Sequence, residues 1–132
     1  MIVVDSSGWI EFFTGGKNAE RYGGYLEDSV KVATPTIVLY EVYKLTKRER
    51  TEEDALLAAA QMQKTRIVPL SESLALAAAD VALEFRLAMA DAIVYATALS
   101  ERAELVTSDA DMNGLPGVTY IPKRERHGPR RR

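Results

Sequence analysis

The sequence contains no cysteine, and its only histidine, His127, lies close to the end of the chain. The lack of cysteine excludes disulfide bonds, thiolate nucleophiles and Cys-ligated zinc, and it gives no sign of an oxidising compartment. A single histidine in this position does not favour a serine–histidine pair or a multi-histidine metal site. Any chemistry must therefore rest on carboxylates, hydroxyls and amines.

Long apolar runs are also lacking. No stretch approaches the roughly 18 uninterrupted apolar residues of a membrane span, and the N-terminus MIVVDSSG does not have the basic and apolar regions of a signal peptide. We therefore expect a cytoplasmic protein with no membrane partner. The 132 residues, 47% hydrophobic and 27% charged, fit one globular domain with a single core. We expect this domain to span residues 1–121.

Charge is unevenly distributed along the chain. The formal net charge is -2, yet the segment from Pro122 to Arg132 holds six basic residues and one acidic residue. The rest of the chain is therefore acidic. We predict a basic, flexible C-terminal tail over residues 122–132. Such a tail can contact phosphates or a partner, or it can serve only to keep the protein in solution.

Short β-branched runs alternate with longer segments of helical periodicity. Because alternating strands and helices need crossover connections, we predict an α/β fold with a mainly parallel sheet covered on both faces. Asp5 or Ser6 is expected to cap the first helix, and Thr34-Pro35 to begin a later one. A helix over about 18–28 contains two glycines and should be weak. Strands are expected near residues 2–4, 30–33, 66–70, 104–106 and 118–121.

Five acidic residues occupy unusual positions. Asp5 and Asp109 each come just after the carboxyl end of an expected strand, where sites form in parallel sheets. Asp111 follows two residues later. Glu41 lies on an otherwise apolar helix stripe, where an unpaired charge is expensive. Asp91 precedes a nearly all-apolar helix.

Each acid alone also has an ordinary structural explanation. Asp5 can cap a helix, Asp91 can complement a helix dipole, Asp109 and Asp111 can stabilise a turn, and Glu41 can be a surface carboxylate. Gathered in one pocket, they would need protons or cations. Carboxylates about 4 Å apart repel by about 4 kcal/mol per pair at an effective dielectric near 20. Oxygen ligands without histidine or cysteine suit Mg²⁺ or Mn²⁺. The sequence therefore predicts a divalent-metal site.

The segments VVDSS, PTIVLYEVYK, ADAIVYATA and LVTSDAD, in this order, resemble the PIN-domain family, particularly the VapC-type toxins of prokaryotic toxin–antitoxin pairs. The resemblance extends to Ile121. It implies a compact three-layer α/β/α sandwich and Mg²⁺- or Mn²⁺-dependent endoribonuclease activity. Met112 stands where the family often has an aromatic residue. Carried over by position, the expected catalytic residues are Asp5, Glu41, Asp91, Asp109 and Thr107, and the expected metal ligands are Asp5, Asp91, Asp109 and Asp111.

The resemblance also implies partners: an RNA substrate, a cognate VapB-like antitoxin that covers the acidic pocket, and a second copy of the chain in a homodimer. Aromatic residues of the first helix (Trp9, Phe12 and Phe13) can line a groove for the antitoxin or belong to the core. The alternative function is a non-catalytic RNA- or protein-binding module on the same fold. Thr107 and Ser108 can orient a water or a carboxylate, or simply end the strand.

Overall fold

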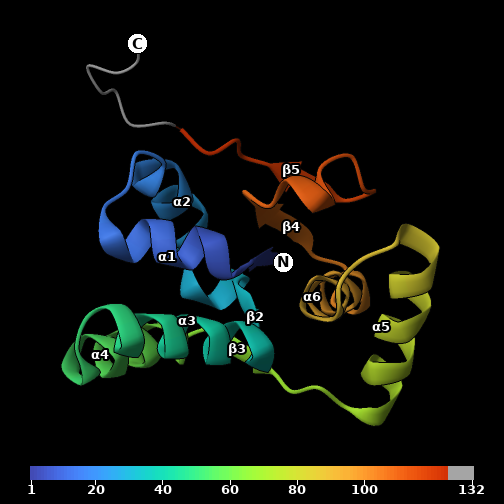
Figure 1. Cartoon of the computed structure of the whole chain (residues 1–132), viewed down its shortest axis with the longest axis horizontal. Coiled ribbons are helices and arrows are strands. Elements are labelled where there is room, and N and C mark those ends of the chain that lie inside the picture. Colours follow the sequence, from blue (N-terminus) through green and yellow to red (C-terminus); the bar gives the residue numbers. More distant parts are fainter. Residues whose placement is uncertain (125–132) are drawn as a thin grey trace.

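The computed structural model describes residues 1–124, so most of the basic tail predicted for residues 122–132 lies outside the described residues. Strands and helices alternate along most of the chain (Figure 1). The strands are β1 (Ile2–Val4), β2 (Ala33–Pro35), β3 (Arg66–Val68), β4 (Glu104–Thr107) and β5 (Val118–Tyr120). The helices are α1 (Ser6–Thr14), α2 (Ala19–Leu26), α3 (Thr36–Glu49), α4 (Glu52–Met62), α5 (Glu72–Phe85) and α6 (Met89–Ser100), with short 3-10 turns η1 (Ser29–Lys31) and η2 (Ala110–Met112).

Every strand pair in the described chain is parallel. One sheet has the order β1-β4-β5, and β2 pairs with β3 in a second. An isolated parallel bridge between Ile2 and Val32 links the two sheets. Because the strands run the same way, their carboxyl ends meet at one edge of the sheet. The predicted parallel α/β fold is confirmed.

Helices cover the strands from two sides. Figure 1 shows α1 to α4 together on one side and α5 and α6 on the other. Between them, Val3, Val4, Leu105 and Val106 of the two central strands are fully buried. Helix α6 is buried almost all round from Ala92 to Ala98, which explains its nearly continuous apolar sequence. In the part of the chain with described coordinates, no helix is both long and apolar enough to cross a membrane.

The second strand and the helix after it begin later than predicted. Residues 29–31 form the turn η1, and the strand β2 runs from Ala33 to Pro35. Thr34 was expected to cap the next helix, but its hydroxyl is hydrogen-bonded to that of Thr65 at 2.6 Å inside the core. Helix α3 therefore begins at Thr36 without a side-chain cap. The prediction was wrong here because a buried strand contact used the hydroxyl.

Three other helices begin at a capping side chain, and the cap predicted at Asp5 is confirmed. Asp5 caps α1 by accepting a hydrogen bond from the backbone N–H of Gly8. Thr51 caps α4 and Ser71 caps α5 in the same way. Each cap satisfies a backbone donor that the first helical turn leaves without a partner. The cap at Asp5 also fixes that carboxylate at the end of β1.

Candidate metal centre

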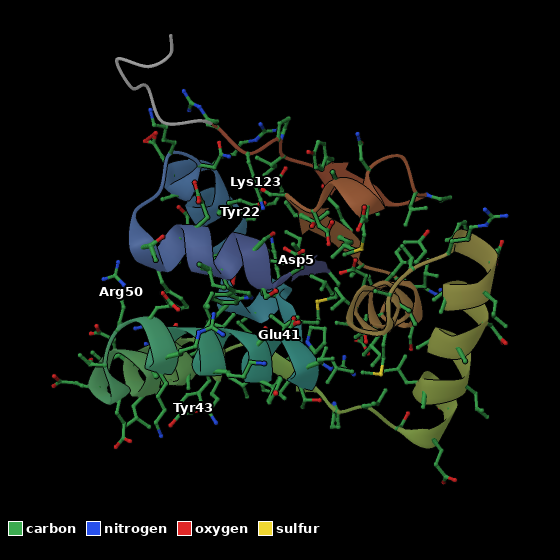
Figure 2. All side chains as sticks on the ribbon, in the orientation of Figure 1. Asp5, Tyr22, Glu41, Tyr43, Arg50 and Lys123 are labelled. Atoms are coloured by element: carbon green, nitrogen blue, oxygen red, sulfur yellow. The ribbon has the colours of Figure 1, made fainter. Side chains whose placement is uncertain are left out.

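A cavity of about 590 Å³ lies at the carboxyl ends of β1 and β4. We call it the acidic cavity, because four carboxylates line it. They come from distant parts of the sequence: the end of β1, the middle of α3, the first turn of α6 and the loop after β4. Figure 2 shows two of them, Asp5 and Glu41, in the middle of the molecule. The cavity is lined by Asp5, Ser6, Ser7, Glu41, Asp91, Val94, Ser108, Asp109, Ala110, Tyr120, Pro122 and Lys123.

Asp5 is held rigidly at the base of this cavity, with only 5% of its surface exposed. One carboxylate oxygen accepts hydrogen bonds from the Ser7 hydroxyl at 2.6 Å and the Gly8 N–H at 3.2 Å. The other accepts from the Thr107 hydroxyl at 2.5 Å. Burial raises the pKa of Asp5 and outweighs these bonds, which lower it. A negative charge at Asp5 is thus oriented by three donors but is not neutralised by them.

Thr107 connects the ends of the two central strands. Its fully buried hydroxyl donates to Asp5, just after β1, and accepts from the backbone N–H of Asp109 at 2.9 Å. The Thr107 hydroxyl therefore both donates to and accepts from acidic residues of the site. Thr107 was expected among the catalytic residues, and the structure places it where it positions two carboxylates.

Asp91, Asp109 and Asp111 form a close carboxylate group. Each offers an oxygen, and these oxygens all lie within 4.8 Å of one another. The turn η2 brings Asp111 in, because the Asp111 N–H donates to the Asp109 carboxylate at 2.9 Å. Burial, then the neighbouring Asp109 carboxyl, raises the pKa of Asp91 to about 7. Three hard oxygen donors that repel one another fit a divalent cation such as Mg²⁺ or Mn²⁺.

Glu41 faces the same cavity from α3. It is half-buried, and burial raises the pKa of its carboxyl, with a smaller raising effect from the charge of Asp5 and an opposing hydrogen bond from Ser6. Among the described residues, Asp5 and Glu41 do not join the three-carboxylate group. The structure therefore brings all five predicted acids to one region but divides them into a group of three and two flanking residues.

Sequence reasoning missed Tyr22 and the contact that joins it to Ser108. The hydroxyls of Tyr22 and Ser108 lie 2.5 Å apart, which ties α2 to the loop after β4. Tyr22 is fully buried, and this burial raises its pKa to about 12. Apolar neighbours predict a buried tyrosine, but no sequence signal pairs it with a serine 86 positions away.

Gly8 permits the close packing behind Asp5. A Cβ atom at this position would lie 2.4 Å from Cε1 of Tyr22 and 2.5 Å from Cγ1 of Val4. Those distances are far shorter than a van der Waals contact, so only glycine lets α1 begin this close to α2 and β1. The Gly8 N–H is also one of the three donors to Asp5.

The three aromatic residues of α1 lie in different places, and one of them, Phe12, is exposed outside both the core and the cavities. Trp9 is buried, whereas Phe13 lines a cavity of about 550 Å³ between α1, α3 and α4. We call this second one the apolar cavity. Its lining residues are Ile10, Phe13, Thr14, Leu45, Thr46, Glu49, Arg50, Asp54, Leu57, Ala58 and Gln61.

A parallel α/β sheet with a carboxylate cluster beyond its strand ends defines a class of α/β proteins whose site lies at that edge of the sheet. Within this class, the chain belongs to the PIN-domain family: the family model described as PIN domain matches residues 2–118. This confirms the family to which the sequence motifs point. Among curated proteins, none matches the chain significantly.

Solved structures share this fold over most of their length. A toxin–antitoxin complex from Klebsiella pneumoniae has 27% sequence identity and a TM-score of 0.79, covering 94% of this chain and 100% of the other. Mycobacterium tuberculosis VapC20, described as a Sarcin-Ricin loop cleaving toxin, has 22% identity and a TM-score of 0.68 over 86% and 92% of the two chains. VapBC2 from Rickettsia felis, bound to a promoter DNA fragment, has 15% identity and a TM-score of 0.71 over 92% and 98%.

Proposed function

We propose that this protein is a Mg²⁺- or Mn²⁺-dependent endoribonuclease that acts as the toxin of a toxin–antitoxin pair. The observation that carries the proposal is the group of three carboxylates, Asp91, Asp109 and Asp111, whose oxygens lie within 4.8 Å of one another. Two of them, Asp91 and Asp109, line the acidic cavity. Membership of the PIN-domain family supports it. The similarity to a toxin–antitoxin complex at 27% identity supports the biological role.

The three grouped carboxylates are the residues that would hold the cation. When bound, the cation would polarise a phosphate and lower the pKa of a water molecule. The Thr107 hydroxyl and the Asp109 carboxylate fix the relative positions of β4 and the turn η2, so the donors keep their spacing. Asp5, which Ser7, Gly8 and Thr107 orient, presents further negative charge to the same cavity.

Glu41 is suited to handling the proton of the attacking water. Burial raises its pKa, and a carboxylate with a raised pKa is a better base near neutral pH than an ordinary one. It reaches the cavity from α3, whereas the grouped carboxylates come from α6 and the loop after β4. We assign Glu41 the role of accepting this proton. Asp5 holds an oriented negative charge beside it.

We further propose a cognate antitoxin as the protein partner, RNA as the substrate and the cytoplasm as the place of action. The Klebsiella pneumoniae structure is itself a toxin–antitoxin complex. The apolar cavity supplies a surface for apolar side chains of such a partner, because Ile10, Phe13, Leu45 and Leu57 converge there from three helices. The homodimer remains a prediction from the family resemblance.

RNA cleavage with matched variants tests the nuclease proposal. Wild type should cleave single-stranded RNA with Mg²⁺ or Mn²⁺ and stop when a chelator is added. Asp91→Asn and Asp109→Asn should lose the activity, and Asp80→Asn, an exposed aspartate on α5, should keep it. Cleavage that survives both substitutions, or that ignores the chelator, would overturn the proposal. Folded protein that neither cleaves RNA nor binds metal would favour the non-catalytic module instead.

A further inference from the structure

One basic residue lines the acidic cavity. Lys123 follows β5 on the segment that leads out of the domain, and it lines the cavity together with the carboxylates. Figure 2 shows Asp5 between Glu41 on one side and Lys123 on the other. Among the described residues, no ion pair joins Lys123 to any of these acids. Its ammonium group is therefore available to a ligand at the rim of the cavity.

Hydrogen bonds on both sides hold the backbone of Lys123 in this place. The N–H of Ile121, a fully buried residue, donates to the Thr107 carbonyl at 2.8 Å. The side-chain amide of Asn18 donates to the Pro122 carbonyl at 2.9 Å. Beyond Lys123, a guanidinium nitrogen of Arg124 lies 3.4 Å from the Lys17 carbonyl. The lysine is thus carried by an anchored segment.

The Asn18 side chain binds the Pro122 carbonyl in place of capping its own helix. Asn18 occupies the N-cap position of α2, where an asparagine side chain usually accepts a hydrogen bond from the first helical turn. It makes no such bond, and its amide instead binds a carbonyl 104 positions away. Only 5% of its surface is exposed. The side chain therefore stabilises the Pro122–Lys123 segment instead of its own helix.

The charge distribution suggests what Lys123 binds. An RNA strand that reaches the carboxylate group brings several phosphates, and those next to the scissile one lie close to Asp5 and Glu41, which repel them. An ammonium group at the rim lowers this cost, because basic side chains bind phosphates mainly through charge. We propose that Lys123 is a phosphate-binding residue for the RNA substrate, placed by the Asn18 anchor. This inference rests on the proposed function.

RNA binding tests the inference without relying on cleavage. Binding of a labelled single-stranded RNA is measured with Mg²⁺ over a range of KCl concentrations, in the Asp5→Asn background, which should cleave slowly and keeps the three grouped carboxylates. Adding Lys123→Ala should weaken binding about 5- to 10-fold and reduce the slope of log K against log salt by about 0.7, the value for one phosphate contact on a single strand. Lys123→Arg should restore both quantities, since it keeps the charge.

A matched lysine provides the control. Lys31 is exposed on η1, before the amino end of β2 and hence at the opposite edge of the sheet from the cavity. Lys31→Ala should leave affinity and salt slope unchanged. Asn18→Ala should weaken RNA binding with the salt slope kept, because the lysine remains but is less well placed. In cleavage assays of otherwise wild-type protein, Lys123→Ala should raise KM by a similar factor with kcat within about two-fold.

The outcomes separate this inference from the nuclease proposal. If wild type does not cleave RNA but binding depends on Lys123 as described, the nuclease proposal fails and the phosphate contact stands. If wild type cleaves and Lys123→Ala matches wild type in affinity, KM and salt slope, the phosphate contact is overturned. A loss of kcat at unchanged KM, or the absence of any RNA binding, would also overturn it.

Discussion

The acidic and apolar cavities are nearly equal in volume, at about 590 and 550 Å³, but they differ in chemistry. The acidic cavity gathers carboxylates from four separate parts of the chain. The pKa values of Asp5, Glu41 and Asp91 are all raised, and burial is the largest cause in each case. The apolar cavity gathers aliphatic and aromatic side chains from three helices. The repelling carboxylates of the acidic cavity lower the free energy of unfolding when no cation is bound. The apolar cavity exposes apolar surface to water.

This difference separates two kinds of ligand. Buried like charges cost free energy, and this cost is the reason that we propose a cation, with a substrate bound to it, as the ligand of the acidic cavity. Apolar surface costs free energy in water, so a site that keeps it is organised for side chains of a partner.

Replacing Asp5 should remove activity without loss of stability. In Asp5→Asn, the amide oxygen can keep the bonds from Ser7 and Gly8, but the amide NH₂ faces the Thr107 hydroxyl, whose hydrogen loses its acceptor. Removal of the buried charge offsets this loss, so the free energy of unfolding in metal-free solution should change little. RNA cleavage should fall about 10²- to 10³-fold, as for loss of one oriented electrostatic group. Denaturant melts and initial rates measure the two effects, and a variant that unfolds would contradict this account of the hydrogen bonds.

A methyl group at Gly8 should destabilise the packing next to the acidic cavity. Gly8→Ala forces a Cβ against Tyr22 and Val4, and overpacking of this kind costs about 1–3 kcal/mol. Gly24→Ala is the matched control, since a Cβ there meets nothing within 4 Å and alanine favours a helix by about 1 kcal/mol. Urea unfolding should show opposite signs for the two variants. Equal stability changes would mean that the packing around Gly8 is looser than the structure shows.

A charge placed in the apolar cavity should weaken binding of the antitoxin and leave folding unchanged. Leu57 is 62% exposed at its edge, so Leu57→Glu should fold normally and weaken binding of the cognate antitoxin about 10-fold through lost apolar contact. Leu83 on α5 is 83% exposed and does not line the cavity, so Leu83→Glu should bind normally. Titration calorimetry with the antitoxin compares the two. Equal affinities would mean that the antitoxin docks elsewhere.

The raised pKa of Asp91 should make metal-free stability depend on pH. Burial and the Asp109 carboxyl raise the folded pKa of Asp91 to about 7, above the ordinary value of 3.8. Between these values the native state binds more protons than the unfolded state, so stability should fall as pH rises from about 4 to about 7. Because Asp91 is only partly buried, we expect about 1 kcal/mol. In Asp91→Asn this part of the pH dependence should disappear from chemical denaturation curves, and its persistence would assign it to other groups.

Local patterns in the sequence were sufficient for much of the fold and of the acidic cavity. Apolar runs that end at Asp5 and Thr107-Ser108-Asp109 predicted where strands deliver acids, because strand ends are read from adjacent residues. The structure places Asp5, Glu41, Asp91 and Asp109 around one cavity, as their positions in the sequence suggested. Asp111 joins Asp91 and Asp109 through a backbone turn, which the sequence suggested only weakly.

Long-range polar contacts could not be predicted in this way. Thr34 turns to Thr65 instead of capping α3, Tyr22 bonds Ser108, and Asn18 holds Pro122. Each contact joins residues far apart in the chain, and either partner alone has an ordinary local explanation. The same is true of Lys123, which a sequence reading leaves in the basic tail and the fold brings to the cavity.

The central claim is that the carboxylates of the acidic cavity hold a divalent cation. Titration calorimetry of Mn²⁺ into wild type, Asp91→Asn and Asp80→Asn at about pH 7.5 tests it directly, because binding is measured without RNA or antitoxin. We expect saturable binding by wild type and Asp80→Asn, with binding lost or strongly weakened in Asp91→Asn. Equal binding by all three proteins, or no binding by folded wild type, would contradict it.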